Sequence, residues 1–142
     1  GREIEKLAGC GIPQIHSLYG ANAYRRYERR AVEEVIQIFP EVVMATPGGL
    51  VSDSATFNLV LAHCYTVWLQ ADPEDHMRRV REQGDLRPMS GPGAMEDLRR
   101  ILAGRASFYA KADLTYRTSG KTLEQAFAGL RAQVRAAIAE VG

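Results

Sequence analysis

The sequence contains little cysteine, little histidine and no long apolar run. Cys10 and Cys64 are widely separated, with no CxxC pair and no histidine-rich stretch beside them, so they predict free thiols and no zinc site. No apolar run approaches the ~20 residues that a membrane helix needs. The first ten residues, GREIEKLAGC, lack the apolar core of a signal peptide. These absences predict a cytoplasmic protein with no membrane partner.

A strong charge of either sign is also missing. The 18 Lys and Arg residues against 17 Asp and Glu residues leave a net charge of +1, without the basic field typical of nucleic-acid binding. Most of the cations are arginine, which suits planar, bidentate recognition of carboxylate or phosphate; a G+C-rich genome gives the same bias. With 142 residues and 46% apolar content, we expect one domain, residues 1–142.

The sequence does contain short apolar runs that alternate with amphipathic stretches. Residues 42–46, 65–69 and 114–118 are rich in β-branched or aromatic side chains and predict strands. The alternation predicts an α/β fold with a parallel sheet and helices on its faces. Apolar residues at helical spacing predict helices at residues 21–39, about 54–64, 73–83 and 95–109, and from Thr122 onward.

Two glycine-rich breaks are candidate ligand sites. The first predicted strand stops at Pro47-Gly48-Gly49, and ligands gather where strands of open α/β sheets end. A tight turn from strand to helix explains these glycines equally well. The second break, residues 84–94, holds three Gly and two Pro around Arg87. Such a loop is often a lid over a binding site, and a disordered connection is the alternative.

Three short segments, taken together, resemble shikimate kinase: YRRYE at residues 24–28, the Gly48-Gly49 pair, and LRPM at residues 86–89 followed by GRASFY from Gly104. That family is a small P-loop kinase with a three-layer α/β/α parallel sheet. A solvated, salt-bridged helix face is the alternative for any one of the arginines at residues 25–30. The resemblance implies a ligand site made of Tyr24, Arg25, Gly48, Gly49, Arg87 and Arg105, with Arg87 in the lid reaching the phosphates.

Two departures from the family pattern argue against kinase activity. The 142 residues contain no G-x-x-x-x-G-K-[ST], the motif whose backbone, lysine and hydroxyl hold the phosphates and magnesium. The first glycine of the family's triplet is Pro47 here. We therefore expect a fold truncated at its N-terminus, without the P-loop strand, with no catalytic residue and no metal ligand. ATP and magnesium are expected only if the intact protein has a P-loop.

A longer stretch carries a second resemblance. CYTVWLQADPEDHMRRVREQGDLRPM, with EDLRRILAGRASFY after it, resembles the C-terminal domain of transcriptional regulators of aerobic and anaerobic benzoate catabolism. Those proteins join a helix-turn-helix DNA-binding domain to a kinase-like domain that senses benzoyl-CoA. The resemblance implies an effector domain that is not an enzyme, a benzoyl-CoA-type effector, and DNA bound only through a domain outside these residues. A homodimer is a further expectation.

Two other functions remain as alternatives. One is a fragment of an active shikimate kinase, which transfers phosphate from ATP to shikimate. The other is a different P-loop kinase that acts on a small molecule.

Overall fold

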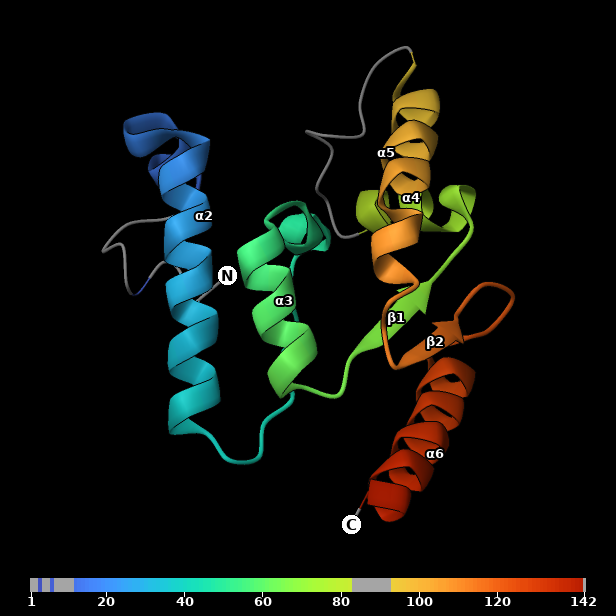
Figure 1. Ribbon diagram of the computed structural model, residues 1–142. Coiled ribbons are helices and arrows are strands. Elements are labelled where there is room, and N and C mark those ends of the chain that lie inside the picture. The colour runs from blue at the N-terminus through green and yellow to red at the C-terminus, as the bar shows by residue number, and fades with distance from the viewer. Residues whose placement is uncertain (1–2, 4–5, 7–11, 83–92, 142) are drawn as a thin grey trace. The chain divides into compact units, whose positions relative to one another are not determined.

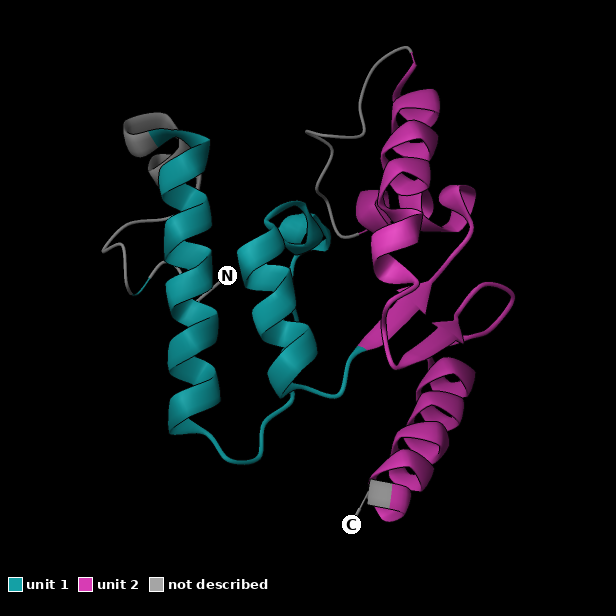
Figure 2. Ribbon diagram, viewed as in Figure 1, with its two compact units in different colours: residues 1–66 teal, residues 67–142 magenta. Residues whose placement is uncertain are grey.

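The computed structural model of the chain describes residues 3, 6, 12–82 and 93–141 (Figure 1). The chain divides into two compact units, residues 1–66 and residues 67–142, which Figure 2 colours separately. The described part of the first unit is helical, and the second unit contains a parallel sheet. Of the predicted lid, residues 84–92 lie outside the described residues.

The first unit is built from a long helix and a shorter one. Helix α2, Ile12–Ile38, is interrupted at Gly20, where φ is 82° and ψ is 174°, a conformation that only glycine adopts without strain. The 3-10 helix η1, Gly48–Ser52, leads into helix α3, Ser54–His63. Asp53 caps α3, because its Oδ1 accepts hydrogen bonds from the backbone amides of the second and third residues after it.

Apolar side chains join α2, η1 and α3 into one small core. The long helix contributes residues at helical spacing along one face, and each buried Val, Leu or Phe stabilises the unit by ~1.5–3 kcal/mol. This packing fixes the faces of α2 and α3 that remain accessible. The buried apolar residues are Ala23, Tyr24, Ala31, Val32, Val35, Leu50, Val51, Phe57 and Val60.

The strand predicted at residues 42–46 is not formed, so this prediction was wrong. The segment has no ladder partner in the described part of the chain, and the side chain of Val43 is 99% exposed. β-Branched composition alone does not make a strand, because backbone N–H and C=O groups need a neighbouring strand to bond with. The predicted sheet of three strands is therefore a sheet of two in the described residues.

The second unit contains that two-stranded parallel sheet. Strand β1, Val67–Gln70, pairs with strand β2, Leu114–Arg117, in a register that places Trp68 beside Thr115. β1 begins two residues later than predicted, and β2 agrees with its prediction within one residue. Two helices lie between the strands in the sequence. Helix α4, Pro73–Glu82, comes before residues 83–92, and helix α5, Ala94–Tyr109, comes after them.

Buried side chains hold α4 and α5 together. Met77 from α4 packs with Ala94 and Leu98 from α5, and Met95 and Leu102 lie against this cluster. Helix α6, Leu123–Val141, begins at a reciprocal cap. The backbone N–H of Gln125 donates to the Thr122 hydroxyl at 3.1 Å, and the backbone N–H of Thr122 donates to the side-chain Oε1 of Gln125 at 2.9 Å. No helix among the described residues is long and apolar enough to cross a membrane.

Gly129 of α6 lies against the Tyr116 side chain of strand β2. A Cβ atom there would lie 2.2 Å from the hydroxyl oxygen of Tyr116, whose side chain is only 5% exposed and has little freedom to move. We expect Gly129→Ala to lower the free energy of unfolding by ~1–3 kcal/mol, because overpacking outweighs the better helix propensity of alanine. Differential scanning calorimetry measures this as a lower Tm.

Gly104 in α5 is the matched control for Gly129. A Cβ at this position meets no atom within 4 Å, so Gly104→Ala adds only helix propensity and should raise stability by up to ~1 kcal/mol. If Gly129→Ala raised the Tm as Gly104→Ala does, the packing of α6 on Tyr116 would be incorrect.

Candidate functional site

Tyr24 and Arg25 both bind Glu28 on helix α2. Glu28 is 1% exposed; its Oε2 accepts a hydrogen bond from the Tyr24 hydroxyl at 3.3 Å, and its Oε1 accepts one from Arg25 Nη1 at 3.0 Å. The helix itself brings the three side chains together, because residues at i, i+3 and i+4 share a face. The Arg25 guanidinium also lies over the Tyr24 ring, 5.5 Å from its centre. Sequence reasoning placed the first two residues at the ligand site but missed the anchoring role of Glu28.

This arrangement leaves Arg25 fixed and still able to bind a ligand. A guanidinium carries five N–H donors, and Glu28 accepts from one Nη group of Arg25. The Arg25 side chain is 30% exposed, so part of it reaches solvent. A buried carboxylate behind a partly exposed guanidinium orients that group for a planar anion such as a carboxylate.

Tyr24 is a buried phenol beside a carboxylate. Its pKa is raised, and burial is the largest cause. The negative charge of Glu28 and the hydrogen bond to it raise the pKa further, and the nearby charge of Arg25 has a smaller, opposite effect. The neutral phenol is therefore favoured in the folded protein. The neutral Tyr24 phenol contributes fully to the free energy of unfolding below the pKa of tyrosine in the unfolded chain. This contribution is lost as the pH rises through the higher pKa of Tyr24 in the folded protein.

We expect one tyrosine to ionise late in an absorbance titration of the folded protein at alkaline pH. Tyr24→Phe should remove this late step, and Glu28→Gln should move it to lower pH, since the carboxylate that raises the pKa is lost. Tyr65→Phe is the control, because Tyr65 is 46% exposed. A late step that survives in Tyr24→Phe would contradict the assignment.

Gly48 and Gly49 begin η1 and are not held in a left-handed conformation. Among the described glycines, only Gly20, Gly93 and Gly120 have positive φ. The conformational freedom of Gly48 and Gly49 is therefore not used by the backbone here. What remains for a ligand is the lack of a side chain at the start of η1, and their role in binding stays a prediction.

Arg105 lies on helix α5 in the second unit. Tyr109, on the following turn, packs at a tilt against Trp68 of strand β1, with ring centres 5.4 Å apart. The Met77 cluster holds the other end of α5 against α4. Arg105 is half-buried, and its side chain makes no hydrogen bond or ion pair with the described residues. It is thus a cation on a fixed helix, without a partner in that part of the chain.

The predicted site residues belong to different parts of the chain. Tyr24, Arg25, Gly48 and Gly49 lie in the first unit and Arg105 lies in the second. Arg87 lies outside the described residues. The convergence of these residues on one ligand therefore stays a prediction.

A second polar cluster, at the carboxyl ends of β1 and β2, was not predicted. Arg79 donates to the Thr118 hydroxyl at 2.8 Å and to the Thr118 carbonyl at 3.3 Å, and the Asp72 amide donates to the Ser119 hydroxyl at 2.7 Å. A hydrogen bond from Ser119 lowers the pKa of the Asp75 carboxyl. These bonds tie the segment after β2 to the start of α4. No group of three His, Cys, Asp or Glu side chains in the described ranges could hold a metal ion.

The family model described as "Shikimate kinase" matches residues 1–135. The chain belongs to the shikimate kinase family. Curated shikimate kinases from Zymomonas mobilis and Bradyrhizobium diazoefficiens are 35% identical over 123 residues and 34% identical over 137 residues. These matches cover 87% and 93% of this chain, but only 69% and 65% of the two relatives' own lengths. The match to the shikimate kinase from Nitrobacter winogradskyi covers 52% of that relative's length.

Solved shikimate kinases have the same fold. The enzyme from Acinetobacter baumannii, solved in complex with shikimate, gives a TM-score of 0.80 at 21% identity and covers 96% of this chain and 75% of its own. Shikimate kinase from Bacteroides thetaiotaomicron gives a TM-score of 0.78 at 22% identity, covering 92% of this chain and 76% of its own. The predicted P-loop kinase fold is thereby confirmed.

The predicted regulatory function was wrong. Family members at about one third identity over most of the chain are named shikimate kinase, which contradicts the benzoate-regulator effector domain, the absence of an enzyme and the link to transcription. The benzoyl-CoA effector has no support from these relatives. The stretch from Cys64 to Met89 was a misleading guide, because a shared kinase-like fold keeps its helix and strand pattern whether or not the protein is an enzyme.

Proposed function

We propose that these residues form the shikimate-binding part of a shikimate kinase, which transfers a phosphoryl group from ATP to shikimate. The observation that carries the proposal is the family match over residues 1–135, together with relatives of that name at 34–35% identity. The chain spans between about half and about two thirds of the length of these relatives, so the activity is proposed for the intact protein.

In this proposal Arg25 binds the carboxylate of shikimate. Glu28 holds the guanidinium in place, which reduces the conformational entropy lost when the ligand binds. Arg105 supplies a second cation, and Gly48 and Gly49 let the ring approach the backbone. Shikimate is a small polyol acid, and the one charge it carries at neutral pH is the group that an oriented arginine recognises best.

ATP and magnesium belong to the proposed reaction, but the described residues do not fit them. The 142 residues contain no G-x-x-x-x-G-K-[ST], and the described part of the chain has no cluster of metal-ligating side chains. We therefore assign no step of phosphoryl transfer to these residues. Their role is to hold shikimate, in the cytoplasm, where ATP is available.

Calorimetric titration of shikimate into the intact protein tests this role. Arg25→Ala should weaken binding about tenfold to a hundredfold, because a hydrogen bond to a charged group contributes ~1.5–3 kcal/mol. Arg135→Ala is the control, since Arg135 is exposed on α6. Equal affinity in wild type and Arg25→Ala would contradict the proposed site.

A further inference from the structure

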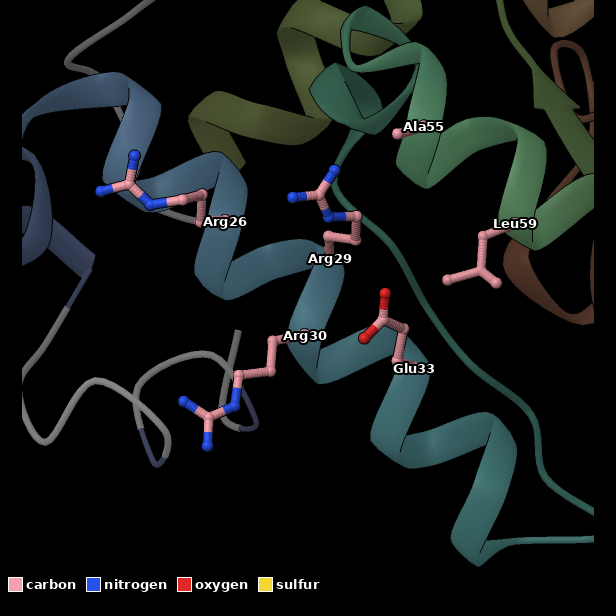
Figure 3. A pocket seen from close by; sticks show the side chains of 6 residues that line it. All are labelled: Arg26, Arg29, Arg30, Glu33, Ala55 and Leu59. Atoms are coloured by element: carbon pink, nitrogen blue, oxygen red, sulfur yellow. The ribbon is translucent and has the colours of Figure 1, made fainter.

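A hollow of about 540 Å³ lies within the first unit, between α2 and α3 (Figure 3). Its volume is in the range of small-molecule sites. Figure 3 shows the side chains of α2 and α3 that border it, and Arg25 is not among them. The lining consists of Arg26, Arg29, Arg30, Glu33, Ala55 and Leu59.

Two of the three arginines of this hollow have no ion-pair partner in the described part of the chain. The side chains of Arg26 and Arg29 make no hydrogen bond or ion pair with described residues, and Arg30 meets Glu34 only at 3.8 Å, on an exposed face. On the same helix, by contrast, Arg25 is anchored by a buried carboxylate. Like charges at i,i+3 and i,i+4 destabilise a helix, so an anion held near these arginines would reduce their repulsion.

The lining combines charge with an apolar wall. The lining holds three cations and one anion, and it remains positively charged when Glu34, the ion-pair partner of Arg30, is counted, so it favours an anion. Ala55 and Leu59 of α3 face the same hollow and offer apolar contact to the rest of a ligand. Arginine is suited to phosphate because its planar donors bind two oxygens at once.

We propose that the hollow between α2 and α3 binds a small organic phosphate monoester, with the phosphate on Arg29 and the organic group against Leu59, and with Arg26 and Arg30 adding positive charge at the rim. A phosphate monoester is largely a dianion above its second pKa of ~6. Glu33 repels the phosphate and sets the limit on affinity. This site is independent of the proposed shikimate kinase activity, because it uses neither Arg25 nor Arg105.

Phenyl phosphate is the probe, titrated calorimetrically into the 142-residue chain at pH 7.5 and low salt. Arg29→Gln should weaken binding about tenfold, since it removes a charge-assisted contact, whereas Glu33→Gln should strengthen binding about threefold or more. The control is a double variant that carries Arg131→Gln and Arg135→Gln, at two exposed positions on α6. It changes the net charge by more than Arg29→Gln does and should leave binding unchanged. Salt should weaken binding to the wild type.

Two further ligands separate charge from shape. Inorganic phosphate should bind more weakly than phenyl phosphate, and benzyl alcohol, which has no charge, should not bind. The proposal is overturned if wild type does not bind phenyl phosphate, or if Arg29→Gln and Glu33→Gln bind it as wild type does. It is also overturned if inorganic phosphate binds as tightly as phenyl phosphate. The same holds if neither phosphate binds the arginines and an acidic peptide does.

Discussion

Glu28→Ala should lower the free energy of unfolding by about 3 kcal/mol, the low end of the cost of breaking a buried ion pair. The substitution leaves the buried Tyr24 hydroxyl and the Arg25 guanidinium without the acceptor they share. We expect the low end because the Arg25 side chain is 30% exposed and water can solvate part of it. Urea denaturation followed by circular dichroism measures the change.

Thr56→Val is the matched control, because Thr56 is also a fully buried polar residue of the first unit. Its hydroxyl has no hydrogen-bond partner in the described part of the chain, so replacing it with a methyl group should leave stability unchanged or slightly higher. Glu28→Gln keeps an acceptor and should fall between the two variants. A loss of less than ~0.5 kcal/mol for Glu28→Ala, typical of surface changes, would show that Glu28 is not an anchor.

Arg105→Ala should reduce the kcat/KM of the intact protein for shikimate about 100-fold. Arg105 is a half-buried cation with no partner among the described side chains, on a helix held by the Trp68–Tyr109 ring contact and the Met77 cluster. Losing one charge-assisted contact of ~1.5–3 kcal/mol in the transition state accounts for that factor. A coupled assay of ADP formation at varied shikimate concentration gives the measurement.

Arg100→Ala provides the comparison on the same helix. Its side chain is 77% exposed and meets Asp97 only at 3.7 Å, so we expect kcat/KM to change by less than about threefold. If Arg105→Ala and Arg100→Ala gave the same kcat/KM, Arg105 would be an ordinary surface arginine and not part of the site.

Local signals in the sequence predicted most of the helices. Gly20, Asp53, Pro73 and Thr122 each mark a helix break or start, because capping and φ restrictions act within a few residues of the chain. The run at residues 42–46 shows the limit of such signals. Its composition is that of a strand, but strand formation depends on a partner that composition does not reveal.

The candidate site was predictable in part for the same reason. Arg25 and Tyr24 were identified from the YRRYE segment, and Glu28 lies in that segment at helical spacing, so its anchoring role was within reach of sequence reasoning. The hollow between α2 and α3 was not. Arg26 and Arg29 have the pattern of a solvated face, and only the packing of α3 beside α2 turns that face into a hollow.

The function was the least predictable feature. The LRPM and GRASFY segments resemble two families at once, and fold and motif alone do not separate a kinase from a ligand-binding domain of the same shape. The comparison with curated shikimate kinases at 34–35% identity decided which family the chain belongs to.

Shikimate-dependent turnover of ATP by the intact protein is the most direct test of the proposed function. ATP, magnesium and purified protein are incubated with and without shikimate, and ADP and a phosphorylated shikimate are quantified by chromatography. We predict that both products form in equal amounts, only when shikimate is present. ADP formation that does not depend on shikimate, or no turnover by a folded protein at saturating ATP and shikimate, would contradict the proposal.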